Sequence, residues 1–507
     1  MVKGIGSWLP KQCERFGDKT ALVYREKRFT YAQFNERVNR LADCFLAQGV
    51  QKGTRVGAIL FNTNEMIEVL FACAKIGAIC VPINYRLSVD EIEYIANDAG
   101  VDWLFYDERM QAAVTELTKR KTAIQTWVHV GAAVPFGQLE YEGLLREGNN
   151  QEPYVSVHID DVHMMMYTSG TTGKPKGVML SHGNTLWNAI NAVHAMSLQD
   201  DDSTLTVAPL FHIGGMNVFT TTLLYKGGKV VLHDKFDPVL TLETIGKEKI
   251  TTLFMVPAMW LAIMHLPNFD HYDLGSLRLN VSGGAPCPLT VIEFFQKRNI
   301  PFYEGFGLTE TAPFVALLDP ANSLRKNGSI GKTPIHTDAR VVNEAGIDVQ
   351  ANEIGELIVR GPNVMKGYWN LPEATQNVMK EGWFYTGDLA RVDEEGFFYI
   401  VDRKKDMIIT GGENVYPTEV EQVIMRYPGV REVAVIGVHD EFWGESVKAF
   451  VVLQDHLQSL TVEELRNHCE GKLAHFKMPK FLEIIPQLPR NATGKILKNV
   501  LREQGGK

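Results

Sequence analysis

The chain has 507 residues, of which 45% are hydrophobic and 22% are charged, and its net charge is −9. This length predicts at least two domains, and the acidic balance gives no indication of a nucleic-acid partner. The sequence has no run of about 18 uncharged apolar residues and no apolar N-terminal stretch, so we expect a cytoplasmic protein without a transmembrane segment or secretory signal. Its six cysteines contain no Cys-x-x-Cys pair, which predicts reduced thiols rather than a metal or redox site.

The first third of the sequence alternates between helix and strand patterns. Residues 31–49 have the period of an amphipathic helix, with Thr30 placed to cap its start and Gly49 to end it. Continuously apolar strands that alternate with helices predict a parallel sheet with helices on its faces. The alternating segments that follow are a strand at 55–61, a helix at 64–77, strands at 78–84 and 101–107, and a helix at 88–100.

Four more apolar strands are expected further along, at 203–212, 228–234, 250–257 and 277–286. From Glu353 the pattern changes to short strands separated by glycine-rich and acidic turns, which is typical of antiparallel sheet. The fold class we predict is therefore α/β. A large multi-layer N-terminal domain (1–402) would contain parallel sheets, helices and a small β-barrel-like part, and a small mobile α+β domain (403–507) would follow it.

Residues 167–177, with the sequence YTSGTTGKPKG, combine hydroxyls, glycines and lysines. A Walker A loop is excluded because Gly173-Lys174 is followed by Pro175 instead of Ser or Thr. The chemistry still suits phosphate, since hydroxyl and backbone N–H groups donate to anions and lysines add positive charge. A solvated surface loop is the alternative interpretation from composition alone. The candidate phosphate ligands are Thr168, Ser169, Gly170, Thr171, Thr172, Gly173, Lys174 and Lys176.

The longer stretch YTSGTTGKPKGVMLSH resembles the phosphate-loop signature of the adenylate-forming superfamily, which includes acyl-CoA synthetases, luciferases and peptide-synthetase adenylation domains. Further motifs of this superfamily follow in order along the whole chain: PLFHIGG, SGGAP, EGFGLTET, YTGDLA, DRKKDMIITGGENVYPTEVE and PRNATGKI. The resemblance is closest to fatty-acyl-CoA synthetases. It implies a ligase that uses ATP, Mg2+ and coenzyme A. A carboxylate would attack the α-phosphorus of ATP, and the thiol would then displace AMP from the acyl-adenylate.

The resemblance also assigns roles to single residues. Lys495 would bridge the carboxylate and the α-phosphate, Thr309 would bind phosphate, and Glu310 would be the Mg2+ ligand. His212 would gate the acyl and pantetheine channels. Phe306 replaces the tyrosine common in the superfamily and can still stack on adenine. The nucleotide would also contact Gly284, Ala285, Glu304, Gly305, Phe306, Gly307, Thr309, Asp388 and Arg403.

Two half-reactions would share one reaction centre. Because Lys495 and a thiol cannot approach the same carbonyl–phosphate group together, the small domain would rotate. The resemblance places the hinge of this rotation at Lys405. The second face of the small domain would carry the CoA channel. The resemblance places that channel at Gly412, Glu413 and Asn414.

The resemblance places the acyl pocket at small or apolar residues, which predicts an apolar acid. No acidic residue follows His212, which argues against an amino-acid substrate. Gly214 predicts an open channel and a medium- or long-chain fatty acid, whereas Phe314 would shorten the pocket. An aryl or arylpropenoic acid is therefore the alternative. The candidate positions are Ile213, Gly214, Gly283, Gly307, Pro313 and Phe314.

A catalytically silent nucleotide-binding protein is a second alternative, although the presence of Lys495, Glu310 and Asp388 argues against it. The expected partners are a small carboxylic acid, ATP and CoA. The sequence leaves open a peripheral membrane contact and a homodimer.

Overall fold

The computed structural model describes residues 4–168, 174–454, 459–490 and 496–505. They form two compact units. The first contains the residues up to Ala339 and Val359–Phe384, and the second contains Arg340–Ile358 and the chain from Tyr385 onward. The predicted domain boundary at residue 402 stays a prediction. No helix in the described ranges is both long and apolar enough to cross a bilayer.

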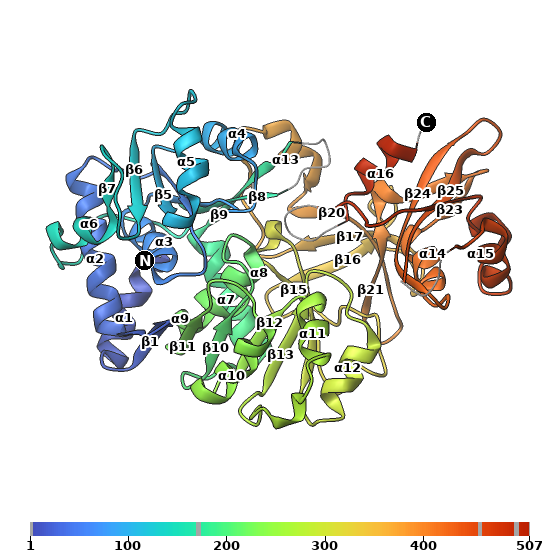
Figure 1. The fold of residues 1–507 in the computed structure, drawn as a ribbon, viewed down its shortest axis with the longest axis horizontal. Coiled ribbons are helices and arrows are strands. Elements are labelled where there is room, and N and C mark those ends of the chain that lie inside the picture. Colours follow the sequence, from blue (N-terminus) through green and yellow to red (C-terminus); the bar gives the residue numbers. More distant parts are fainter. Residues whose placement is uncertain (1–3, 169–173, 455–458, 491–495, 506–507) are drawn as a thin grey trace. The chain divides into compact units, whose positions relative to one another are not determined.

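One sheet of the first unit has the strand order β18-β9-β8-β4-β3-β5-β6-β7. Its strands β5 to β9 are labelled in Figure 1. Its strands from β8 to β7 are parallel, as the apolar alternation predicted, and β9 and β18 are antiparallel at one edge. The bounds are β3 (Arg55–Ile59), β4 (Ile79–Pro82), β5 (Trp103–Asp107), β6 (Thr126–Val130), β7 (Leu139–Glu140), β8 (Val162–Thr168), β9 (Lys176–Ser181) and β18 (Gly367–Tyr368).

A second sheet of this unit has the order β15-β14-β13-β12-β10-β11-β1-β2. Only its edge strands β2 and β15 are antiparallel to their neighbours. Helices α10, α11 and α12 pack on it around buried Trp260 and Phe295. The bounds are β1 (Thr20–Tyr24), β2 (Lys27–Thr30), β10 (Ser203–Thr206), β11 (Lys229–Leu232), β12 (Thr252–Met255), β13 (Leu279–Gly283), β14 (Phe302–Gly307), β15 (Phe314–Leu318), α10 (Pro238–Glu248), α11 (Pro257–Met264) and α12 (Leu289–Gln296).

The helix predicted at residues 31–49 begins directly after Thr30, as its cap predicted. Thr30 and Gln33 form a capping box at the start of α2 (Tyr31–Ala47), and Gly77 in the left-handed conformation ends α3 (Asn64–Ile76). Every residue of α3 is buried, so this helix is part of the core. The other helices are α1 (Trp8–Phe16), α4 (Val89–Ala99), α5 (Gln111–Leu117), α6 (Tyr141–Glu147), α7 (His182–Ala195), α8 (Ile213–Gly215), α9 (Thr221–Lys226) and α13 (Pro372–Val378).

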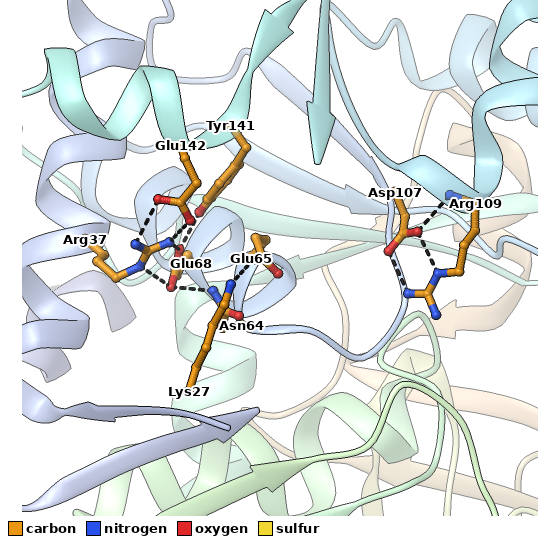
Figure 2. A network of polar contacts seen from close by, with 9 residues as sticks. All are labelled: Lys27, Arg37, Asn64, Glu65, Glu68, Asp107, Arg109, Tyr141 and Glu142. Carbon is orange, nitrogen blue, oxygen red and sulfur yellow. Dashed lines mark hydrogen bonds and ion pairs between the residues drawn. The ribbon is translucent and has the colours of Figure 1, made fainter. Parts of the chain in front are cut away.

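A buried ionic network joins α2, α3 and α6 (Figure 2). Arg37 on α2 donates to both carboxylate oxygens of Glu68, at 2.8 and 3.1 Å, and to Glu142 at 2.7 Å. The Tyr141 hydroxyl donates to Glu68 at 2.5 Å and the Asn64 amide donates to it at 3.0 Å. Glu68 has no exposed side-chain surface, so these donors replace the water that its charge requires.

The second unit is built mainly of antiparallel strands. Strands β16, β17, β20 and β21 form one of its sheets, and β23-β22-β25-β24 with β26 beside β25 form another. The predicted α/β class with an α+β segment at the C-terminal end is confirmed. The bounds are β16 (Asp338–Val342), β17 (Gly355–Arg360), β20 (Trp383–Val392), β21 (Phe398–Arg403), β22 (Ile408–Thr410), β23 (Glu413–Val415), β24 (Val430–Asp440), β25 (Gly444–Leu453), β26 (Phe481–Ile484), α14 (Pro417–Ile424), α15 (Val462–Cys469) and α16 (Lys498–Gly505); β19 (Met379–Lys380) pairs with the start of β20.

Candidate active site

The candidate phosphate loop connects two antiparallel strands. Thr168 ends β8, Lys176 begins β9, and the two residues pair in register. The ammonium of Lys174 lies 5.5 Å from the centroid of the Tyr94 ring. Ser169, Gly170, Thr171, Thr172 and Gly173 lie outside the described residues, as does Lys495.

Glu310, the candidate Mg2+ ligand, lies in a short 3-10 helix (Thr309–Thr311) after β14. Its Oε1 accepts a hydrogen bond from the Tyr368 hydroxyl at 3.0 Å, and its backbone carbonyl accepts from Met365 N at 2.8 Å. The Lys176 ammonium lies 5.2 Å from the Tyr368 ring centroid. The fold therefore brings a loop lysine and the candidate metal ligand to one place.

The residues present fit a magnesium ion. The described part of the chain has no group of three or more His, Cys, Asp or Glu side chains that would form a metal cage. Mg2+ does not need one, because it typically takes one or two protein carboxylates and completes its shell with phosphate oxygens and water. A single carboxylate such as that of Glu310, oriented by the Tyr368 hydroxyl, suits that role.

The turn that carries Glu310 continues into the candidate acyl pocket and is held by asparagines. Asn217 Nδ2 donates to Ala312 O at 3.1 Å, and Asn188 Oδ1 accepts from Phe314 N at 3.1 Å. A Cβ atom on Gly307 would lie 1.8 Å from Pro313 O, so only glycine permits this close approach. These contacts bring Gly307, Pro313 and Phe314 together with the helical segment that follows Gly214.

Glu304 in β14 and Ser282 in β13 are paired neighbours on adjacent parallel strands. Both are buried, and Glu304 Oε1 has no hydrogen-bond partner among the described residues. Burial raises the pKa of the Glu304 carboxyl to about 7. An unsatisfied buried acceptor beside exposed Gly284 and Ala285 fits a donor such as the amino group of adenine. Gly305 and Phe306 follow Glu304 on the same strand.

His212 follows the loop after β10. Asn62 fixes that loop, because its side chain accepts from Leu210 N at 2.9 Å and donates to Ala208 O at 3.0 Å. Burial, with a smaller effect of Arg86, lowers the pKa of His212 to about 4, so the ring is neutral at neutral pH. Its Nε2 has no hydrogen-bond partner in the described ranges.

The space beside Gly214 is filled by the ring of Phe254, a residue of β12. A Cβ atom on Gly214 would lie 2.8 Å from this ring, and one on Gly283 would lie 3.1 Å from it. A small cavity of about 10 Å³, lined by Gly214, Gly215, Phe219 and Phe254 among others, lies there. The Phe254 ring therefore borders Gly214, beside which we predicted an open channel, and that channel stays a prediction. Ile213 is buried beside Gly214.

The remaining candidates belong to the second unit. Asp388 on β20 and Arg403 on β21 pair in register, and Arg403 Nε lies 2.6 Å from Asp388 Oδ1. Lys405 lies in an exposed 3-10 helix (Lys404–Asp406) directly after β21. Gly412 has a φ of 85° and open space at its Cβ position, in the turn between β22 and β23. Glu413 and Asn414 begin β23 and are exposed.

Sequence reasoning missed three residues of this site: Asn62, Phe254 and Tyr368. Each acts on a partner far along the chain, such as Glu310, which lies 58 positions from Tyr368. Of the three, only Phe254 lies in a segment that the sequence predicted, the apolar strand at 250–257. Its position beside Gly283 follows only from the register between β12 and β13, which the sequence does not give.

Comparisons with known proteins identify the family of the chain. The AMP-binding enzyme family model matches residues 9–369, and the model of its C-terminal domain matches residues 419–495. A feruloyl-CoA synthase of Amycolatopsis is 41% identical over 504 residues, 99% of each chain. A long-chain-fatty-acid–CoA ligase of Mycobacterium tuberculosis is 36% identical, over 94% of this chain and 93% of that one. The structure of a Bacillus subtilis o-succinylbenzoate–CoA synthetase with ATP and magnesium superposes with a TM-score of 0.86, at 32% identity, covering 97% of this chain and 98% of that chain.

The chain belongs to the AMP-binding enzyme family of adenylate-forming enzymes. Within that family it is an AMP-forming acid–CoA ligase that uses ATP, Mg2+ and coenzyme A. The suspected membership of the superfamily is confirmed, and the alternative of a catalytically silent protein loses its support.

Proposed function

We propose that this ligase activates an aryl or arylpropenoic acid and transfers it to coenzyme A. The observation that carries the proposal is the packing of Phe254 against Gly214 and Gly283, with ring atoms 2.8 to 3.1 Å from where a Cβ atom would stand on either glycine. An aromatic wall flanked by glycines offers a flat apolar surface on which a planar acid can stack.

The same packing disfavours a long alkyl chain. Carbons that extend toward the Cβ position of Gly214 would meet the Phe254 ring, which lies 2.8 Å from that position. Each CH2 left unburied forfeits about 0.8 kcal/mol, so three or four would cost about 3 kcal/mol, roughly a hundredfold in kcat/KM. The fatty acid that Gly214 alone predicted is therefore the less supported substrate.

The relatives support the same choice. The feruloyl-CoA synthase is more similar to this chain than the fatty-acid ligase is, at 41% against 36% identity. The structural neighbour with ATP and magnesium bears the name of an enzyme for another aromatic acid, o-succinylbenzoate.

In the proposed adenylation step the acid carboxylate attacks the α-phosphorus of ATP and pyrophosphate leaves. Lys174 and Lys176 attract the phosphates electrostatically, and Lys495 balances the charge at the reacting oxygens. Glu310 would hold Mg2+, which would supply further positive charge at the phosphates. Neutral His212 can donate a hydrogen bond through its unpaired Nε2 to the bound acid or to the pantetheine arm.

In the second step the CoA thiol attacks the acyl carbonyl and AMP leaves with its oxygen. The proposal assigns rotation of the small domain to the exposed residue Lys405, and passage of the pantetheine arm to Gly412, where open space lies at the Cβ position. Asp388 and Arg403 would hold the ribose and phosphate of the nucleotide.

The test is a panel of acids with ATP, Mg2+ and CoA, in which AMP and thioester are quantified. The panel contains ferulate, cinnamate, benzoate and straight-chain acids of six to sixteen carbons. We expect the highest kcat/KM for an arylpropenoic or aryl acid. A maximum at a straight-chain acid would overturn the proposal, and its chain length would measure the depth of the pocket.

A further inference from the structure

Tyr368 lies between two groups of the nucleotide site that come from distant parts of the sequence. Its hydroxyl donates to Glu310 Oε1 at 3.0 Å, and its ring lies under the Lys176 ammonium, 5.2 Å from the centroid. No sequence motif that we used includes this tyrosine, and its contacts with both groups suggest that it organises them.

The backbone around Tyr368 is firmly held. The residue pairs with Val178 in β9, the strand that leaves the phosphate loop, and its N–H donates to Thr375 Oγ1 at 2.9 Å. The next residue, Trp369, donates to Gly177 O at 2.8 Å. These contacts fix the backbone that carries the Tyr368 side chain. A fixed backbone allows its hydroxyl to hold another side chain in one orientation.

The hydroxyl also remains a donor. A phenol keeps its proton at neutral pH, so the Tyr368 hydroxyl can donate to the Glu310 carboxylate at the 3.0 Å that separates them. A hydroxyl that donates to one oxygen of a carboxylate fixes the plane of that carboxylate and leaves its other oxygen for a cation.

We propose that Tyr368 is a positioning residue for the metal site: its hydroxyl orients the Glu310 carboxylate toward Mg2+ bound with ATP. This inference rests on the proposed role of Glu310. Hydrogen-bond partners of metal-ligating carboxylates typically contribute ten- to a hundredfold in metal affinity. The ring of Tyr368, by contrast, serves Lys176, so the two functions of the side chain can be separated by removing the hydroxyl alone.

The experiment measures ATP binding by calorimetry without a carboxylic acid, so that no adenylate forms, once in EDTA and once in Mg2+. The ratio of the two dissociation constants reports how strongly metal and nucleotide are coupled. In Tyr368→Phe we expect this ratio to fall about tenfold or more. Binding in EDTA should stay unchanged, because the ring and its contact with Lys176 remain.

Tyr141→Phe is the matched control, because it removes a tyrosine hydroxyl that donates to a different glutamate, Glu68, at 2.5 Å (Figure 2). Its ratio should equal that of the wild type. In the double variant Glu310→Gln/Tyr368→Phe the ratio should be no lower than in Glu310→Gln alone, because the hydroxyl acts through the carboxylate.

Three results would contradict this account in different ways. If the ratio of dissociation constants is unchanged in Tyr368→Phe and falls to about one in Glu310→Gln, the inference is overturned and the proposed role of Glu310 remains. An equal weakening of binding in EDTA and in Mg2+ shows that the hydroxyl only supports the fold, which also overturns it. An unchanged ratio in Glu310→Gln overturns the proposed metal ligand itself.

Discussion

Asp388 and Arg403 face each other across the paired strands β20 and β21, and Arg403 Nε lies 2.6 Å from Asp388 Oδ1. The Asp388 side chain is 2% exposed, whereas that of Arg403 is 38% exposed. A carboxylate held in this way is pre-oriented by its partner, which suits an acceptor for a diol.

If Asp388 accepts the ribose hydroxyls, the enzyme must discriminate against nucleotides that lack them. We expect wild type to bind AMP about ten- to a hundredfold more tightly than 2′,3′-dideoxy-AMP, since hydrogen bonds to a charged group contribute about 1.5–3 kcal/mol. Asp388→Ala should lose most of that ratio, as measured by calorimetry. If Asp388→Ala keeps the full ratio of the two affinities, Asp388 does not contact the ribose hydroxyls.

Glu304 makes stability depend on pH. Its pKa of about 7 in the folded chain lies above the ordinary value of 4.5, so the folded state binds the proton more tightly. The stabilisation is complete below pH 4.5 and is lost as pH rises through 7, by about 3 kcal/mol at most. Glu304→Gln should remove this loss, so that its melting temperature exceeds that of the wild type at pH 8 and not at pH 5.

Scanning calorimetry at both pH values, without nucleotide, provides the comparison. A variant whose melting temperature differs from that of the wild type by the same amount at pH 5 and pH 8 would show that Glu304 is not protonated in the folded state near neutral pH.

Gly412 is predicted to serve only the thioester step. Gly412→Leu should leave acid-dependent pyrophosphate exchange intact and abolish most acyl-CoA formation, because the side chain enters space intended for the pantetheine arm. Gly396→Leu is the matched control. Gly396 has a φ of 80° against 85° for Gly412, also with open space at Cβ, so the backbone strain of the two substitutions is alike. Equal losses of thioester formation in both variants would place the effect in the backbone rather than in a CoA channel.

Lys495 is predicted to serve only the adenylation step. Lys495→Ala should lower adenylate formation by several orders of magnitude and largely spare thioester formation from a synthetic acyl-adenylate. Lys498, three positions after Lys495, forms an ion pair with Glu421 at 2.8 Å. Lys498→Ala is the control and should affect neither step strongly. Rapid-quench assays of each half-reaction give the measurement. If Lys495→Ala slows both half-reactions equally, the division of labour between two faces of the small domain is wrong.

Much of the fold follows from local patterns. Thr30 and Gln33 form a capping box within four positions, and the apolar strands beside α3 and α4 are recognisable from composition alone. The order of strands in the sheets could not be predicted, because the local hydrophobic pattern of a strand does not indicate its partner. The pairings of β18 with β9 and of β12 with β13 are examples. Tyr368 and Phe254 take their roles from those pairings. For the same reason Gly214 suggested an open channel. The sequence shows that Gly214 has no side chain, but it does not show that the Phe254 ring from another strand lies beside it.

The central claim, that the acid is aromatic, is tested most directly by competition in a single vessel. Ferulate and decanoate at equal concentrations, with limiting CoA, give thioesters whose ratio by mass spectrometry equals the ratio of the two kcat/KM values. We predict that feruloyl-CoA exceeds decanoyl-CoA with the wild type, and that Phe254→Ala shifts the ratio toward decanoyl-CoA. A wild-type mixture dominated by decanoyl-CoA would contradict the account.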